Sequence, residues 1–305
     1  MAEKLFDLIV IGEGITGLTA ANRAARQGRR VASFEAELFG GLVININELE
    51  GSPAPEHASG VELASSLMQE NAEAGVQSVN EAVMGIAAEN DALQVRTEGT
   101  THVARAIIVA SGARLKRLGI PGEAEFDHRG VSQCADCDGP MFKDEDVVVV
   151  GGGDSALQEA LVLARFCRTV HLVHRGPSFR ARSHLVERVS SNDHITVHWS
   201  TVAEEIVGRQ SVEKVRLRNT ADGATSDLPC VGFFACVGLE PNSAFLPAAI
   251  TRDARGAVIT DASLQTSLAG VWAAGAVRAG YSGLLIDAVK EAETAVAGAL
   301  QRINW

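Results

Sequence analysis

The sequence predicts an α/β fold with two dinucleotide-binding units, and two observations carry this prediction. Short runs of β-branched residues alternate with alanine-rich helical stretches along the 305 residues, a pattern typical of parallel strands covered by helices. A glycine-rich motif that follows a predicted strand and opens a predicted helix occurs twice, beginning at Gly12 and at Gly151. At roughly 150 residues per domain, the length agrees with two compact units.

Composition excludes several classes of protein. Hydrophobic residues make up 46% of the chain, which is enough for folded cores and too much for a disordered protein. The net charge of −11 and an aromatic content of 5% disfavour nucleic-acid binding. No apolar run approaches the ~18–20 residues that span a bilayer, and the N-terminal residues lack a signal-peptide pattern. We therefore expect a cytoplasmic protein without membrane contact.

The first motif is Gly12-x-Gly14-x-x-Gly17, between a predicted strand at 7–11 and a helix expected to end near residue 27. Gly12 permits a tight turn, Gly14 lets the backbone approach a pyrophosphate, and Gly17 lets helix and strand pack closely. The start of the helix offers free N–H groups to the phosphates. Glu35 ends the next strand, 18 positions after Gly17, where a carboxylate binds a ribose hydroxyl. An FAD-type dinucleotide suits this unit.

The second motif follows a predicted strand at 146–150 and opens a helix expected to end near residue 166. Its candidate dinucleotide-binding residues are Gly151, Gly153, Asp154, Ser155 and Ala156.

Cations follow the next strand of this second unit. His174 stands 18 positions after Ala156, and Arg175, Arg180 and Arg182 come after it. They occupy the place that Glu35 takes in the first unit, and they suit a 2′-phosphate, which favours an NADP-type dinucleotide. A solvated surface cluster is the alternative interpretation of the same arginines.

The chain has five cysteines, and Cys134-Ala135-Asp136-Cys137 forms a C-x-x-C pair. No second pair and no histidine pair at zinc-finger spacing accompanies it, so we expect no zinc site. In a reducing compartment the pair fits thiol–disulfide exchange, in which one thiol attacks and the other resolves the mixed disulfide. Asp138 is placed to protonate the leaving thiolate. Two incidental cysteines are the alternative.

The other three cysteines lie in apolar stretches and are interpreted as buried residues, namely Cys167, Cys230 and Cys236.

These features together resemble the low-molecular-weight thioredoxin reductases, which are FAD-dependent pyridine nucleotide-disulfide oxidoreductases, and the related flavoprotein of the alkyl hydroperoxide reductase system. The resemblance covers nearly the whole chain. Besides the motifs above, it rests on Gly40-Gly41, Ala110-Ser111-Gly112-Ala113, Pro121-Gly122-Glu123, 237–242 and 270–275.

The resemblance implies two Rossmann-like three-layer domains, the second inserted in the first. The FAD domain would comprise 1–115 and 240–305, and an NAD(P) domain at 116–239 would carry the cysteine pair. The family forms homodimers and passes electrons from NADPH through FAD to the disulfide, and on to thioredoxin or a similar small redox protein. In this mapping Cys137 faces the flavin, Cys134 attacks the partner and Asp138 is the acid. The resemblance also identifies six further candidate FAD-binding residues: Gly40, Gly41, Ala113, Gly275, Ala276 and Tyr281.

Several positions depart from the family pattern. Leu42 replaces a glutamine near the flavin, Gln158 replaces the first of two acids before Glu159 on the nicotinamide side, and Gly176 replaces a second arginine after His174. The lost arginine removes a charge-assisted bond worth about 1.5–3 kcal/mol, roughly 10- to 150-fold in affinity.

The C-terminal flavin motif also departs from the family. Ala276 replaces an aspartate, and a segment around Tyr281 replaces an Arg-Gln-Ala sequence beside the flavin ring. Tyr281 is a candidate to stack on the ring, with a surface anchor as the alternative.

These departures leave alternative functions open. A related enzyme with a one-electron donor such as ferredoxin is the first. A dithiol oxidase that uses oxygen is the second, and a non-catalytic dinucleotide-binding sensor is the third. The cysteine pair and Asp138 argue against the sensor, which needs neither.

Overall fold

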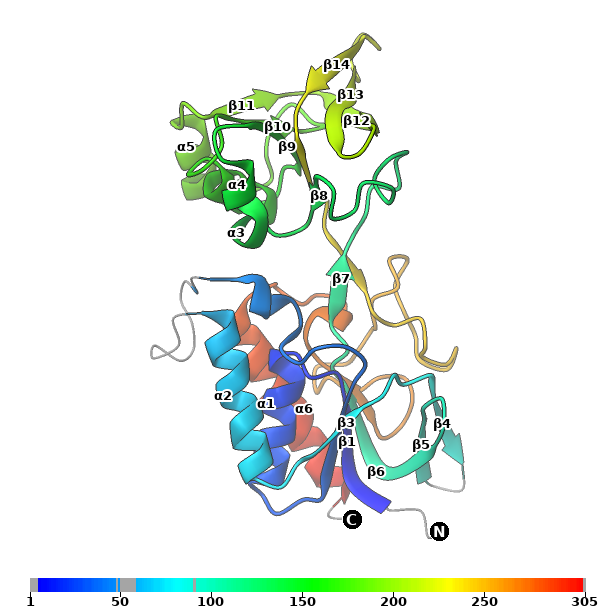
Figure 1. Ribbon diagram of the computed structural model, residues 1–305. Coiled ribbons are helices and arrows are strands. Elements are labelled where there is room, and N and C mark those ends of the chain that lie inside the picture. Colours follow the sequence, from blue (N-terminus) through cyan, green and yellow to red (C-terminus); the bar gives the residue numbers. More distant parts are fainter. Residues whose placement is uncertain (1–4, 48, 50–58, 90–91, 304–305) are drawn as a thin grey trace. The chain divides into compact units, whose positions relative to one another are not determined.

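The computed structural model describes residues 5–47, 49, 59–89 and 92–303 (Figure 1). The chain divides into two compact units: unit 1 consists of Met1–Arg114 with Glu240–Trp305, and unit 2 consists of Leu115–Leu239. Strands β7 (Ala113–Leu115) and β16 (Leu239–Pro241), where the chain passes between the units, pair with each other.

Unit 1 is built on a sheet with the strand order β3-β2-β1-β6-β5-β4. Its parallel strands are β1 (Leu5–Ile11), β2 (Val31–Glu35), β3 (Gln77–Asn80), β6 (Thr101–Val109) and β17 (Val271–Ala273), which pairs with the end of β6. Strands β4 (Gly85–Glu89) and β5 (Ala92–Arg96) extend the sheet in antiparallel fashion. Because β1 and β2 are parallel, the first glycine motif and Glu35 emerge at the same edge.

Helices cover one face of this sheet, and Figure 1 shows them side by side. They are α1 (Ile15–Ala25), α2 (Gly60–Glu73) and α6 (Leu285–Ile303). Leu8 and Val10 of β1 point into the helical face, whereas Ile9 packs on the opposite face beneath residues of 246–258. This alternation follows from the two-residue period of a strand, and it gives unit 1 three layers.

Short 3₁₀ turns η1 (Gly41–Asn45) and η3 (Gly275–Val277) complete unit 1.

Unit 2 has a five-stranded parallel sheet with the order β11-β10-β9-β15-β8. The strands are β8 (Val131–Ser132), β9 (Asp146–Gly151), β10 (Thr169–Val173), β11 (Ile195–His198) and β15 (Gly232–Cys236). Packed on one face are α3 (Ala135–Asp138), the turn η2 (Gly139–Phe142), α4 (Asp154–Leu163) and α5 (Ser183–Ser190). The antiparallel sheet of β12 (Thr201–Gly208), β13 (Val212–Asn219) and β14 (Thr225–Pro229) covers the other face.

The predicted α/β fold with two parallel-strand sheets is therefore confirmed. Both motif helices end earlier than the sequence predicts. The first ends at Ala25 because Gly28 adopts a positive φ of 76° and turns the chain away. The second ends at Leu163, where the bond from the N–H of Phe166 to the Leu163 carbonyl tightens the last turn.

Candidate functional site

The first glycine motif is shaped by close packing around one open position. Gly12 has a φ of 104°, and a Cβ there would collide with the Ala110 carbonyl. A Cβ at Gly17 would collide with the carbonyl of Gly12. At Gly14, in contrast, the nearest atom to such a Cβ is the Gly40 carbonyl oxygen at 3.9 Å. Because Gly14 also caps the start of α1, the open position lies at a helix N-terminus, where phosphates bind.

Glu35 is held at the edge of this motif. Its Oε2 accepts a hydrogen bond from the N–H of Glu13 at 2.9 Å, and its Oε1 accepts from the N–H groups of Ala36 and Glu37 at 2.8 and 3.2 Å. A carboxylate has about four acceptor sites, so capacity remains for a ribose hydroxyl. The residues present fit the ribose and pyrophosphate of a dinucleotide.

Glu13 is a buried carboxyl that the sequence analysis missed. Only 2% of it is exposed, and its Oε1 accepts a hydrogen bond from Ser33 of β2 at 2.5 Å. Its place between two motif glycines gave no signal, because the variable positions of the motif carry no rule for a side chain.

Three of the other predicted glycines gather at the start of α1. The N–H of Gly40 donates to the Glu13 carbonyl at 2.7 Å, and a Cβ at Gly41 would lie 3.5 Å from the Gly14 Cα. Gly275 lies against Thr16, into whose side chain a Cβ would collide. Of the remaining residues predicted for this unit, Ala276 is half-buried in η3 and Ala113 is buried at the start of β7.

The second motif repeats this arrangement in unit 2. A Cβ at Gly151 would lie 2.5 Å from the Ala156 Cβ and from the Cys236 carbonyl oxygen, whereas a Cβ at Gly153 would meet nothing within 4 Å. Asp154 and Ser155 begin α4. The open middle glycine again lies at the start of a helix, so the backbone fits a second phosphate group.

His174 is buried below this turn rather than exposed at its rim. It is 6% exposed, its Nδ1 lies 2.9 Å from the Gly151 carbonyl oxygen, and its Nε2 lies 2.9 Å from that of Ser178. A Cβ at Gly152 would strike the imidazole ring. The ring therefore holds the basic loop against the glycine motif.

The three arginines of the loop are used differently. Arg182 donates to the carboxylate of Asp154 from its backbone N–H at 2.8 Å and from its Nε at 2.7 Å. Arg180 donates its backbone N–H to the Gly152 carbonyl at 2.8 Å. Both Arg175 and Arg180 are exposed, and neither guanidinium has an ion pair among the described residues. These two cations remain available to an anionic group.

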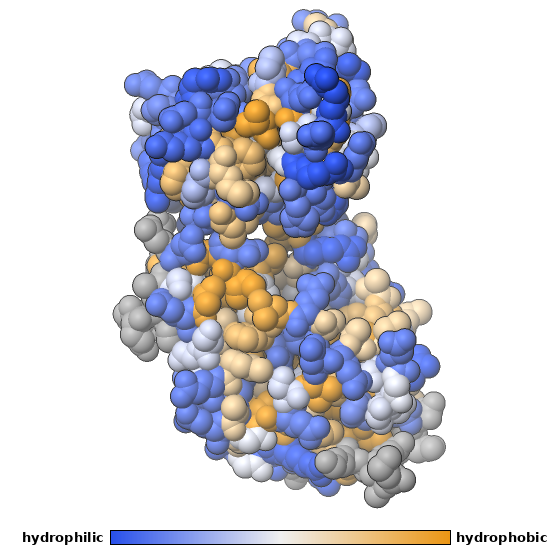
Figure 2. Space-filling model, viewed as in Figure 1, coloured by the Kyte–Doolittle hydropathy of each residue, from blue (hydrophilic) through white to orange (hydrophobic). Residues whose placement is uncertain are grey.

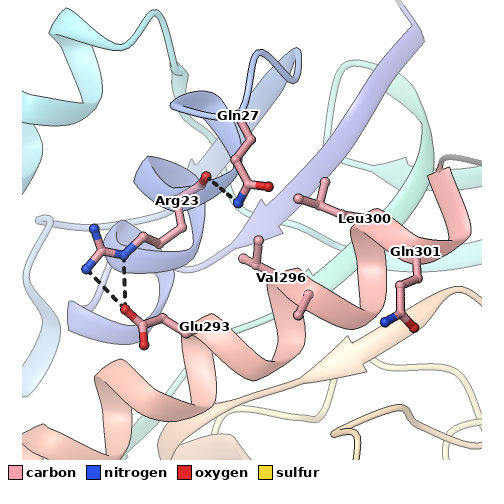
Figure 3. A pocket seen from close by; sticks show the side chains of 7 residues that line it. Arg23, Gln27, Glu293, Val296, Leu300 and Gln301 are labelled. Atoms are coloured by element: carbon pink, nitrogen blue, oxygen red, sulfur yellow. Dashed lines mark hydrogen bonds and ion pairs between the residues drawn. The ribbon is translucent and has the colours of Figure 1, made fainter.

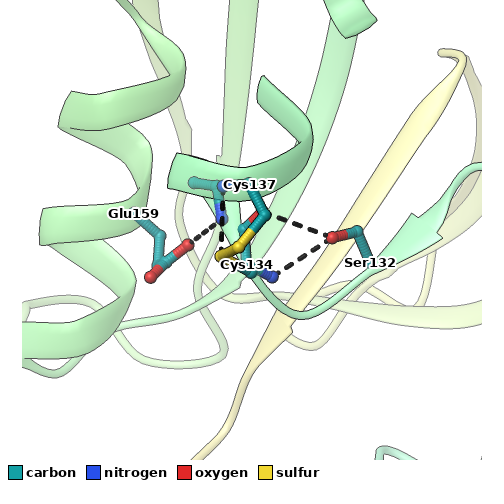
Figure 4. The surroundings of a disulfide bond; sticks show 5 residues. Ser132, Cys134, Cys137 and Glu159 are labelled. Carbon is teal, nitrogen blue, oxygen red and sulfur yellow. Dashed lines mark hydrogen bonds between the residues drawn. A yellow bond between two sulfur atoms is a disulfide. The ribbon is translucent and has the colours of Figure 1, made fainter. Parts of the chain in front are cut away.

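Cys134 and Cys137 form a disulfide at the start of α3, with their Cα atoms 5.3 Å apart (Figure 4). Cys134 caps the helix, and its Sγ accepts a hydrogen bond from the Cys137 N–H at 3.1 Å. The Cys134 N–H donates to the Ser132 hydroxyl at 3.1 Å. Cys137 is exposed, whereas Cys134 and Asp138 are half-buried. The pair has the geometry of a redox-active C-x-x-C at a helix start.

Glu159 of α4 reaches the cysteine helix from the nucleotide motif (Figure 4). Its Oε2 accepts a hydrogen bond from the Ala135 N–H at 2.6 Å. Burial raises the pKa of Glu159 to about 7, and the nearby charge of Asp136 adds to the rise. The resemblance to the family implies a place on the nicotinamide side for this residue, and its contact with the cysteine helix could not be predicted from the sequence.

Comparisons with known proteins agree with this arrangement. The sequence pattern described as pyridine nucleotide-disulphide oxidoreductase matches residues 6–299. The chain is 37% identical to a thioredoxin reductase of Treponema pallidum over 303 residues, which cover 99% of this chain and 98% of that protein. A thioredoxin reductase of Mycolicibacterium smegmatis is 39% identical over 90% of this chain and 89% of its own length.

Solved structures give the same result. The Lactococcus lactis thioredoxin reductase superposes with a TM-score of 0.93 at 33% identity, covering 98% of this chain and 99% of that one. The T. acidophilum thioredoxin reductase superposes with a TM-score of 0.90 at 28% identity and the same coverage. The chain belongs to the pyridine nucleotide-disulphide oxidoreductases. Within them it is a member of the low-molecular-weight thioredoxin reductase family, which confirms the resemblance read from its motifs.

The position of the missing family aspartate lies beside a half-buried ion pair that the sequence did not predict. Glu291 of α6 accepts hydrogen bonds from the Gly275 N–H at 2.8 Å and from the Arg278 Nε at 3.1 Å. The side chains of Arg278 and Glu291 are 17% and 13% exposed. In this family member a carboxylate from α6 therefore holds the backbone beside Ala276. No short motif joins residues so far apart, so this pair could not be predicted from the sequence.

Tyr281 lies close to this pair. Its ring packs against a buried cluster that includes Ile15 and Leu63, and its hydroxyl donates to the Leu284 carbonyl at 2.8 Å. Burial raises the pKa of Tyr281 to about 12. Figure 2 shows apolar side chains gathered on this surface of unit 1, around η1 and the start of α6. Exposed apolar residues of these segments are Leu42, Ile46, Leu284 and Ile286.

The three remaining cysteines all have raised pKa values. Cys167 and Cys230 are buried, and burial raises their pKa values to about 11 and about 12. Burial and the charge of Glu159 raise the pKa of Cys236 as well. A thiol with a raised pKa is a poor nucleophile at neutral pH. The predicted burial is confirmed for Cys167 and Cys230, whereas Cys236 is only half-buried.

A surface pocket of unit 1 lies apart from these residues. Side chains of α1 and α6 line it beside the 3.1 Å ion pair of Arg23 and Glu293 (Figure 3). Over the described ranges, no three potential metal-ligating side chains cluster, and no helix is both long and apolar enough to span a membrane.

Proposed function

We propose that this chain carries electrons from NADPH through FAD to the Cys134–Cys137 disulfide, and from there to thioredoxin or a similar small redox protein. The observation that carries the proposal is the position of the disulfide at the start of α3, joined through Glu159 to the helix of a nucleotide motif. The relatives that share nearly the full length of the chain are thioredoxin reductases, which supports the choice of partner.

FAD would bind to unit 1. The open backbone at Gly14 would bind the pyrophosphate of FAD, and Glu35 would bind its ribose. Gly40 and Gly41 lie beside Gly14 and leave space for the pyrophosphate. When bound, FAD supplies two-electron transfer between a pyridine nucleotide and a disulfide. The division of the chain into unit 1 and unit 2 supports an FAD domain at 1–115 and 240–305 with an inserted NAD(P) domain at 116–239.

NADPH would bind to unit 2. The backbone at Gly153 is open for the pyrophosphate, and the exposed guanidinium groups of Arg175 and Arg180 would pair with the 2′-phosphate. His174 would support this site from below by fixing the loop that presents both arginines.

In the reduced protein Cys134 would be the attacking thiolate, because the Cys137 N–H that bonds its Sγ favours negative charge there. Attack on a partner disulfide forms a bond between Cys134 and one partner sulfur. The other partner sulfur leaves as a thiolate and takes a proton from Asp138. Cys137 then attacks the Cys134 sulfur, which restores the disulfide and releases the partner as a dithiol.

A turnover assay with thioredoxin tests this proposal. With NADPH as donor, the FAD-loaded protein should reduce thioredoxin disulfide, and Cys134→Ser or Cys137→Ser should abolish turnover while leaving FAD binding unchanged. Cys167→Ala is the matched control and should retain activity, since its thiol is buried and protonated. Loss of turnover in the control, or turnover without the pair, would refute the assignment. We also expect a homodimer, which light scattering on the same preparation measures.

A further inference from the structure

Glu159 links the redox pair to the nucleotide motif within unit 2. We propose that Glu159 is a positioning residue for the cysteine pair and that its carboxyl exchanges a proton with the pair when the disulfide is reduced. This inference rests on the proposed function, in which the pair cycles between disulfide and dithiol.

The positioning role follows from two backbone contacts. The Ala135 N–H donates to Glu159 at 2.6 Å, and Ala135 is fully buried as the residue directly after Cys134. The preceding N–H, that of Cys134, donates to Ser132 at 3.1 Å. Consecutive N–H groups at the start of α3 are thus fixed by two side chains (Figure 4). The contact to Glu159 makes the orientation of Cys134 depend on α4.

Burial and the nearby Asp136 raise the pKa of Glu159, and the hydrogen bond from the Ala135 N–H opposes this rise without cancelling it. No cation forms an ion pair with it in the described part of the chain. The titratable groups that interact with it there are Asp136 from α3 and the half-buried Cys236 from β15, and neither neutralises a carboxylate. Burial raises its pKa to about 7. Glu159 can therefore gain or lose a proton at the pH at which thiols react.

Reduction of the disulfide can leave a thiolate at Cys134, the residue before Ala135, whose N–H donates to this carboxyl. Breaking the S–S bond with two electrons leaves two sulfurs that together take up two protons if both become thiols. When Cys134 remains a thiolate at the start of α3, an ionised Glu159 repels it through Ala135. If Cys137 takes one of the two protons, the other is shared between Cys134 and Glu159. It resides on Cys134 when Glu159 is ionised, and on Glu159 when Cys134 is a thiolate. An ionised Glu159 should therefore keep the Cys134 thiol protonated up to a higher pH than an uncharged residue at this position would.

Alkylation of the reduced protein tests this coupling without any nucleotide. The FAD-loaded full chain is reduced with dithiothreitol, freed of reductant, and reacted with iodoacetamide from pH 5.5 to 9. Glu159→Gln keeps a carbonyl oxygen that can accept from Ala135 but removes the charge. We expect its thiolate titration to shift to lower pH, with alkylation at pH 6.5 at least threefold faster than in the unmodified protein. Glu187→Gln is the matched control, since it removes the charge of an exposed carboxyl on α5, and it should leave the profile unchanged.

A second measurement needs no variant. The infrared difference spectrum between disulfide and dithiol forms at pH 7 should show the gain of a protonated carboxyl band on reduction. Superimposable alkylation profiles for Glu159→Gln and the unmodified chain, or no carboxyl band, would overturn the proposal. Because dithiothreitol replaces the physiological donor, these results stand even if NADPH fails to reduce the protein, so failure of the proposed function is recognised separately.

Discussion

The carboxylate of Glu35 accepts a hydrogen bond from the backbone N–H of Glu13 at 2.9 Å. This bond joins the end of β2 to the turn of the first glycine motif. The acceptor for a ribose and the backbone for a pyrophosphate are therefore fixed relative to each other before a dinucleotide arrives, which lowers the ordering cost of binding.

Replacing Glu35 with Gln should weaken FAD binding. The amide keeps the size of the side chain but loses the charge that strengthens bonds to a ribose hydroxyl and to three backbone N–H groups. We expect the FAD dissociation constant to rise at least about 10-fold. Titration of the apoprotein with FAD, followed by flavin fluorescence, measures it. Glu37→Gln, at the exposed neighbour, is the control and should bind normally; equal affinities for both variants would remove Glu35 from the site.

Gly176→Arg should tighten NADPH binding without changing NADH binding. The φ of this position is not in the left-handed region, and the nearest atom to a Cβ is the His174 Nε2 at 3.1 Å, so the imidazole must give way by a few tenths of an ångström. One added charge-assisted bond to the 2′-phosphate gives roughly 10- to 150-fold in affinity. Arg175→Ala should have the opposite effect. Equilibrium binding of both nucleotides checks this, and parallel changes for NADH and NADPH would contradict the placement of the 2′-phosphate.

Glu291→Ala should destabilise unit 1 strongly. Removal of the carboxylate leaves the half-buried Arg278 without its ion-pair partner and the Gly275 N–H unpaired, a change that costs about 1.5–3 kcal/mol. The exposed pair of Arg23 and Glu293 provides the comparison, since Glu293→Ala should cost about 1 kcal/mol or less. The free energy of unfolding, measured in urea for both variants and the unmodified chain, tests this prediction. A small loss for Glu291→Ala would show that the pair is dispensable.

Stability should fall with rising pH because of Glu159. Its folded-state pKa of about 7 lies above the ordinary value of 4.5, so between these values the native state binds more protons than the unfolded state. The resulting loss is complete above pH 7 and amounts to at most about 3 kcal/mol. Glu159→Gln should therefore gain stability relative to the unmodified chain between pH 5 and pH 8. The free energy of unfolding is measured for both proteins at pH 5 and pH 8. A difference between the two proteins that is the same at both pH values would argue against a raised pKa of Glu159.

Local rules explain what the sequence predicted well. The roles of Gly12, Gly14 and Gly17 depend on backbone sterics within one strand–turn–helix unit, and the structure shows the same crowded and open positions in both motifs. The C-x-x-C pair is equally local, because a single helical turn brings its sulfurs together.

What the sequence did not predict depends on tertiary packing. Glu159 meets Ala135 only because α3 packs on α4, and Glu291 meets Gly275 only because α6 returns to η3. The sequence spacing also could not show that His174 and Arg175 have different surroundings. The His174 ring lies between backbone carbonyls, whereas Arg175 remains exposed. Spacing identifies the loop, but the packing of each side chain decides its use.

An anaerobic titration of the FAD-loaded protein tests the central claim most directly. Flavin absorbance is followed while NADPH, NADH and reduced ferredoxin are added in separate runs. The proposed function predicts that NADPH bleaches the flavin and that thiol titration then finds the Cys134–Cys137 pair reduced. A flavin that ignores both pyridine nucleotides but is reduced by ferredoxin would contradict it and assign the chain a one-electron donor.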